Sequence, residues 1–166
     1  MDFKVFIAHL PASYLLGKAG AKLNKIDAAA IVLWTSIGGV LPDIDMFYFY
    51  LIDSQSTHHR SYITHWPVTW VIVIITSLLL IRFHRRLSIA LLGLGFGSML
   101  HMVLDSIAAP VLWMAPFSQM KIELITIPAV YENYIWSFVL HWTFAFEVII
   151  CIVAAVVFWK SRTPQR

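Results

Sequence analysis

The sequence predicts an all-α, polytopic membrane protein, and both its composition and its hydropathy support this fold class. Hydrophobic residues make up 60% of the 166 residues and charged residues only 13%. The mean hydropathy is +0.77. Soluble domains average about 45–50% apolar and about 25% charged residues, so this chain has too little polar surface to cover a globule in water. The composition excludes a disordered chain, a disulfide-stapled secreted scaffold and a nucleic-acid-binding module.

Four long apolar runs predict four spanning helices within a single integral membrane domain, 1–166. The runs cover about residues 26–51, 66–83, 87–106 and 135–159, and the first is interrupted at residues 42–45. Roughly 18–25 helical residues cross a hydrocarbon core of about 30 Å. A shorter apolar run at 3–16 fits either a shallow amphipathic N-terminal helix or a fifth, short span that enters from the far side.

Lysine and arginine predict the orientation of these spans. They form three clusters that flank the apolar runs: Lys18, Lys22 and Lys25; Arg82, Arg85 and Arg86; and Lys160, Arg162 and Arg166. Alternating crossings place all three clusters on one side, which the positive-inside rule makes cytoplasmic. The opposite side then receives the loops 52–65 and 107–134. The length of the second loop predicts a functional cover rather than a simple turn.

Acidic and histidine side chains collect on the outer side of this topology. Those at the outer helix ends, about two turns below them, or in the first outer loop are Asp43, Asp45, His58, His59, His65, His101, Asp105, His141 and Glu147. A charged side chain at the bilayer centre costs roughly 2.5–3.5 kcal/mol, so these groups need partners. Because imidazole and carboxylate are ordinary ligands of divalent metals, the pattern predicts a metal site.

Local spacing supports this prediction at two places. His101 and Asp105 are four residues apart, which puts both side chains on one helical face. Pro42 breaks the helix ahead of Asp43 and Asp45, so both carboxylates can turn inward on irregular backbone, which is tolerated at this depth only against protein or a wet cavity. Taken singly, each motif also fits a structural role, such as a hydrogen-bonded interior histidine or an Asp-x-Asp turn.

The order of these motifs resembles the YdjM-like family of LexA-regulated inner-membrane proteins, which are inferred to be metal-dependent hydrolases. The matching motifs are Ala-His-Leu-Pro with His9, Leu-Pro-Asp-Ile-Asp with Asp43 and Asp45, His59-Arg60-Ser61 followed by Thr64-His65, and Leu100 to Ser106. The resemblance covers most of residues 5–147. It implies an inner-membrane location and a metal site formed by His9, Asp43, Asp45, His59, His65, His101 and Asp105.

The spacing of one motif departs from the family pattern. His59 and His65 stand one position further apart than in the family, which leaves open whether His58 or His59 is the ligand. Arg60 follows His59 directly, which favours His59.

The chain also resembles, more distantly, the all-helical zinc-dependent bacterial phospholipases C. Their His-x-x-x-Asp helix pair looks like His101 and Asp105, and a later His and Glu on one helix resemble His141 and Glu147. This resemblance implies a cluster of two or three Zn ions.

Together, these features lead to the hypothesis of metal-assisted phosphoester hydrolysis at the outer, periplasmic face, on a membrane lipid or lipid-linked substrate. The metal ions would activate water and clamp phosphate oxygens. Asp43 or Asp45 would bridge metals or accept the proton of the water. Arg60 would bind phosphate bidentately.

Three alternatives come from other classes. One is a structural or regulatory membrane protein with a stabilising metal, and another is a metal-ion or proton transporter. A metal-dependent protease is the third, although the sequence has no His-Glu-x-x-His motif.

Overall fold

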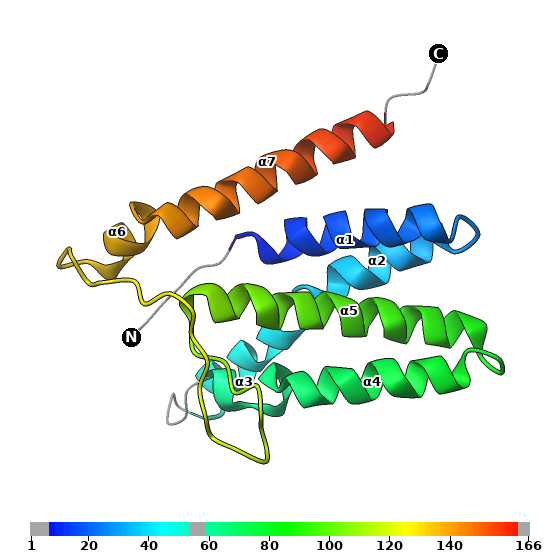
Figure 1. Cartoon of the computed structure of the whole chain (residues 1–166), viewed down its shortest axis with the longest axis horizontal. Coiled ribbons are helices and arrows are strands. Elements are labelled where there is room, and N and C mark those ends of the chain that lie inside the picture. The colour runs from blue at the N-terminus through cyan, green and yellow to red at the C-terminus, as the bar shows by residue number, and fades with distance from the viewer. Residues whose placement is uncertain (1–6, 54–58, 163–166) are drawn as a thin grey trace.

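The protein is a bundle of helices whose axes run roughly side by side (Figure 1). The computed structural model describes residues 7–53 and 59–162. The longer helices are α1 (His9–Leu23), α2 (Ala28–Gly38), α4 (Pro67–Leu80), α5 (Arg85–Ala108) and α7 (Trp142–Arg162), and the shorter ones are α3 (Asp45–Leu51) and α6 (Tyr134–Val139). Within these residues there is no β-strand, only one isolated bridge between Val111 and Ile122. The all-α prediction is therefore confirmed.

Length and apolar composition identify two or three membrane spans among the described helices rather than four. The helices α5 and α7 are each long and apolar enough to cross a membrane. The helix α2 is long enough only when it is counted together with the segment Pro42–Leu51, and the two parts are bent by 46° relative to one another. The bend follows from Pro42, which has no N–H to donate to the preceding turn. The apolar helix α4 has only 14 residues.

The predicted run 135–159 is not one helix. It divides into α6 and α7 at Leu140 and His141. The division has a local cause, because Nδ1 of His141 lies 2.9 Å from the Thr143 hydroxyl and accepts a hydrogen bond from the Thr143 amide. Side chains that bond to nearby backbone groups favour helix ends over helix interiors.

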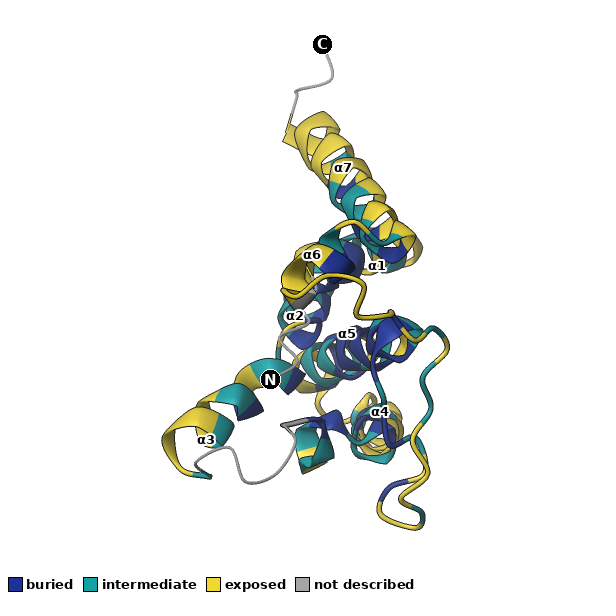
Figure 2. Cartoon of the chain, turned by 90° about the vertical axis from the view of Figure 1, so that its left-hand side faces the viewer, coloured by how far each residue is buried: buried dark blue, intermediate teal, exposed yellow. Residues whose placement is uncertain are grey.

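The N-terminal helix α1 belongs to the bundle. It runs antiparallel to α2 and also contacts α5 and α7 (Figure 1). By length and composition, α1 is not among the candidate spans. In the end view, α7 leaves most of its surface exposed, as a helix surrounded by lipid would (Figure 2).

The described residues of the three basic clusters lie at one end of the bundle. The α1–α2 turn, the α4–α5 turn and the C-terminal end of α7 all lie at the right-hand end in Figure 1. An ion pair between Arg85 Nη2 and Asp27 Oδ2, 2.5 Å apart, ties the start of α5 to the start of α2 at this end. The start of α1, the segment ahead of α4 and the last turns of α5 lie at the opposite end.

Close backbone contact joins α1, α2 and α5 in the middle of the bundle. A Cβ atom on Gly97 would lie 2.2 Å from the Thr35 carbonyl oxygen, and one on Gly39 would lie 2.1 Å from Oγ of Ser13. Only glycine fits at both positions, as is common where helices approach closely in membranes. Ser98 on α5 donates a hydrogen bond of 2.9 Å to the carbonyl of Gly38. The end of α2 is thus held directly against α5.

Replacing Gly97 with alanine should destabilise the bundle. The added methyl group meets backbone, which cannot move as a flexible side chain can, so we expect a loss of roughly 1–3 kcal/mol in the free energy of unfolding. Thermal unfolding in detergent measures this loss, and Phe96→Ala on the exposed face of the same helix is the control. Equal melting temperatures for the two variants would contradict the close contact.

Candidate metal centre

Six of the residues predicted from the sequence converge at the end of the bundle opposite the basic clusters. His9 is the first residue of α1, and Asp43 and Asp45 follow the break after α2. His65 lies two residues before the start of α4, and His101 and Asp105 lie in the last turns of α5. All are buried except Asp43, whose side chain is 40% exposed. Four segments distant in the chain therefore supply imidazoles and carboxylates to one place.

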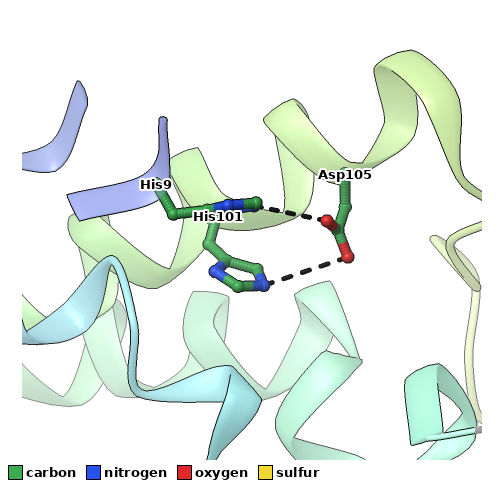
Figure 3. Close-up of side chains that lie close together, drawn as sticks. All are labelled: His9, His101 and Asp105. Carbon is green, nitrogen blue, oxygen red and sulfur yellow. Dashed lines mark ion pairs between the residues drawn. The ribbon is translucent and has the colours of Figure 1, made fainter. Parts of the chain in front are cut away.

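One group of possible ligands consists of His9, His101 and Asp105 (Figure 3). Nε2 of His9 lies 3.2 Å from Oδ1 of Asp105, and Nε2 of His101 lies 3.9 Å from Oδ2 of the same carboxylate. The spacing of four residues between His101 and Asp105 does place both side chains on one face of α5.

A second group consists of Asp43, His65 and His101. Oδ1 of Asp43 lies 3.5 Å from Nε2 of His101 and 3.6 Å from Nε2 of His65. The two groups share one atom, Nε2 of His101. Because that nitrogen has a single lone pair, it can bind only one ion, so the two groups form one centre.

The orientation of His101 determines what this centre can bind. Nδ1 of His101 lies 2.9 Å from the carbonyl oxygen of Gly39. A carbonyl only accepts hydrogen bonds, so Nδ1 carries the proton and Nε2 presents its lone pair in the neutral ring. Nε2 is fully buried and has no hydrogen-bond partner. Its near neighbours, the oxygens of Asp43 and Asp105, are also acceptors when ionised, so a cation between them fits the chemistry.

Asp45 orients His65 and belongs to neither group of possible ligands. Its Oδ2 lies 2.5 Å from Nδ1 of His65 and accepts a hydrogen bond of the same length from the Thr64 hydroxyl. With Nδ1 engaged by Asp45, Nε2 of His65 faces Asp43. Carboxylates that hold a ligating histidine in this way are common behind metal ligands.

The charge of His65 depends on its surroundings. Burial lowers the pKa of His65, but the neighbouring carboxylates of Asp43 and Asp45 outweigh burial and raise the pKa to about 9. With no metal bound, the ring therefore carries a proton at neutral pH.

Arg60, the predicted phosphate ligand, contacts a carboxylate of the centre. Its Nε lies 2.6 Å from Oδ2 of Asp105, and both side chains are buried. The guanidinium offsets the charge of Asp105 inside the bundle. Its predicted role in binding substrate stays a prediction.

The remaining predicted ligands belong to neither group of possible ligands or lie outside the described part of the chain. His58 and the side chain of His59 are not among the described residues. His141 bonds to Thr143 at the start of α7 and lies in neither group. Glu147 accepts a hydrogen bond of 2.8 Å from the backbone amide of Ile7, ahead of α1. This carboxylate therefore links α7 to the segment that carries His9.

Sequence reasoning missed two further contributors, Gly39 and Thr64. The carbonyl of Gly39 fixes the ring of His101, and the hydroxyl of Thr64 bonds to Asp45. Thr64 stands inside a recognised motif, but no spacing rule connects it with Asp45. A backbone carbonyl leaves no signal in a sequence.

Comparison with known proteins places the chain in a family. A family model described as YdjM inner membrane protein matches residues 4–164. No curated protein and no solved structure matches the chain. The YdjM-like resemblance is confirmed, whereas the resemblance to phospholipases C gains no support.

The metal content of purified protein tests the centre. We expect wild type to retain one divalent ion per chain and His101→Ala and Asp105→Ala to lose it, because each substitution removes a converging donor. Inductively coupled plasma mass spectrometry measures the content. His141→Ala is the matched control and should keep the ion. If metal content is unchanged in His101→Ala after metal supplementation, the centre is not a metal site.

The role of Asp45 can be separated from that of a ligand. We expect Asp45→Ala to weaken metal binding about 10–100-fold, the usual effect of losing a carboxylate behind a ligand. Asp45→Asn should restore most of the affinity, since its amide oxygen still accepts from His65. Competition with a chelator measures both dissociation constants. An equal loss of metal affinity in Asp45→Ala and Asp45→Asn would identify Asp45 as a direct ligand instead.

Proposed function

The chain belongs to the YdjM inner membrane protein family, and we propose that it is a membrane-embedded, metal-dependent hydrolase of phosphoesters. The observation that carries the proposal is the buried lone pair on Nε2 of His101, which faces the carboxylates of Asp43 and Asp105 at 3.5 and 3.9 Å. Such an arrangement is unfavourable without a cation, because buried polar atoms need partners.

The donor set favours one first-row divalent ion, such as zinc. Three imidazole nitrogens and two carboxylates suit such metals; the chain's one cysteine, Cys151, is in neither group of donors. We propose a single ion rather than the two or three expected from the sequence. The reason is that the two candidate groups share Nε2 of His101.

Unequal burial supports an enzyme over a structural metal site. The side chain of Asp43 is 40% exposed, whereas those of His65 and His101 are fully buried. Among the candidate ligands, Asp43 is therefore the one through which solvent reaches the centre. Catalytic metal sites keep an open position and structural sites are closed, so a structural or regulatory role is the second candidate.

A transporter finds less support. It would need ionisable groups along a path through the bundle. Between the centre and the basic end, the buried polar side chains of the described residues are hydroxyls: Ser13, Thr35, Ser77, Ser88 and Ser98. Ser77 and Ser98 bond to backbone carbonyls.

The proposed chemistry assigns different roles to the predicted catalytic pair. When bound, the ion supplies a Lewis acid and lowers the pKa of a water molecule toward about 7. Asp43, at the open side, is placed to accept the proton of that water. Asp45 is turned toward His65 and Thr64, and so it positions a ligand rather than reacting.

The location of the centre favours a substrate at the membrane surface. The three basic clusters mark one end of the bundle, and the positive-inside rule makes that end cytoplasmic. We therefore propose a periplasmic centre, four crossings formed by α2 with α3, α4, α5 and α7, and α1 as a short fifth. A lipid or lipid-linked phosphoester reaches such a site from the outer leaflet.

Hydrolysis of phosphoesters by metal-loaded protein tests this function. We expect turnover of a phosphodiester or phospholipid in mixed micelles, and a loss of roughly 10²–10⁴-fold in kcat for Asp43→Asn at saturating metal, the usual range for a general base. Release of phosphate or of the alcohol is measured, and His141→Ala should keep wild-type activity. Stoichiometric metal without turnover of any phosphoester would leave the structural metal site as the better explanation.

A further inference from the structure

Residues 111–122 form a small hairpin beside the metal centre. The amide of Val111 donates to the carbonyl of Ile122 at 3.0 Å, and the reverse bond is 2.9 Å long. The hairpin is fastened to α5 through Ser106, whose hydroxyl accepts from the indole of Trp113 at 2.7 Å. The amide of Leu124 donates to the Ser106 carbonyl at 2.8 Å. The hairpin is thus held to α5 one residue beyond Asp105.

The base and the tip of the hairpin differ in burial. Val111 and Leu112 at the base are buried. The tip exposes Met114, Phe117 and Met120, and Phe117 is 84% exposed. Exposing large apolar side chains to water is unfavourable, so these three side chains together form a surface that water disfavours.

The position of the hairpin indicates what covers this surface. It lies at the end of the bundle that holds the metal centre and projects sideways from α5, past α4, rather than along the helix axes (Figures 1 and 2). In a membrane, that direction runs parallel to the bilayer plane. Since lipid surrounds the lateral faces of a spanning bundle, an element projecting sideways near the helix ends meets the interfacial region.

We infer that this hairpin is a membrane-interface anchor, which inserts Met114, Phe117 and Met120 into the leaflet at the metal-centre end of the bundle. Apolar side chains combined with cations are typical of segments that lie in the interface. Lys121, which is exposed next to Met120, supplies a cation for anionic headgroups. The inference goes beyond the proposed function and holds for any role of the metal centre.

Spin labels at single cysteines test the anchor. Cys151 is the only cysteine, so Cys151→Ser provides the background for Phe117→Cys and Met120→Cys. The labelled proteins are placed in vesicles of phosphatidylethanolamine and phosphatidylglycerol, and power saturation compares collisions with oxygen and with a water-soluble nickel chelate. Glu132→Cys, an exposed acidic position at the same end of the bundle, is the control.

We expect labels at 117 and 120 to collide several-fold more with oxygen than with nickel, and the label at 132 to show the reverse. Nickel access at 117 equal to that at 132 would overturn the anchor. Protection from nickel together with spin–spin broadening at 117 would overturn it as well, because a second copy would then cover the tip. Unchanged metal content and melting temperature confirm that each labelled variant is folded. None of these readouts depends on hydrolysis, so failure of the anchor and failure of the proposed function are distinguishable.

Discussion

The hydrogen bond between the Gly39 carbonyl and Nδ1 of His101 is the interaction on which the centre depends. It leaves the lone pair of His101 on Nε2, inside the bundle and opposite two carboxylates. Without it the ring could rotate or adopt the other tautomer, and Nε2 could then donate a proton to Asp43 or Asp105. Nε2 of His101 would then have a hydrogen-bond partner, and this ring would not need a cation. One backbone acceptor thus favours a metal centre over a structural polar cluster.

That hydrogen bond is in turn a consequence of helix packing. Gly39 follows the end of α2, and its carbonyl reaches α5 only because α2 and α5 approach so closely at Gly97 and Thr35. The glycine contact lies on the cytoplasmic side of the ligands in the proposed orientation. This contact therefore acts as a rigid support for the centre. The segments that carry Asp43 and His65 lie beyond it and can have irregular backbone. Pro42 then turns the chain so that Asp43 enters the centre while Asp45 begins α3.

Much of the centre could be predicted from the sequence because ligand types are rare within apolar runs and because helix spacing is simple. The spacing of His101 and Asp105 predicted that the two side chains share one face of a helix, and the resemblance to the YdjM-like family pointed to His9. The roles of Asp43 and Asp45 were not, since a turn after proline can direct either carboxylate inward. The separation of α6 from α7 was missed because hydropathy does not record the bond between His141 and Thr143. Apolar runs located the helices well but not their ends.

The partition of the acidic residues follows one physical rule, in which each buried carboxylate in the bundle is matched by donors from another segment. Asp45 is matched by His65 and Thr64, Asp105 by Arg60, and Glu147 by the amide of Ile7 ahead of α1. Asp43 differs, because its near neighbours are Nε2 of His65 and Nε2 of His101, and only the former can carry a proton. When a metal takes the lone pair of His65 as well, that proton leaves. Asp43 then lies between solvent and the centre. A group that accepts a proton from a water molecule at the centre needs this position.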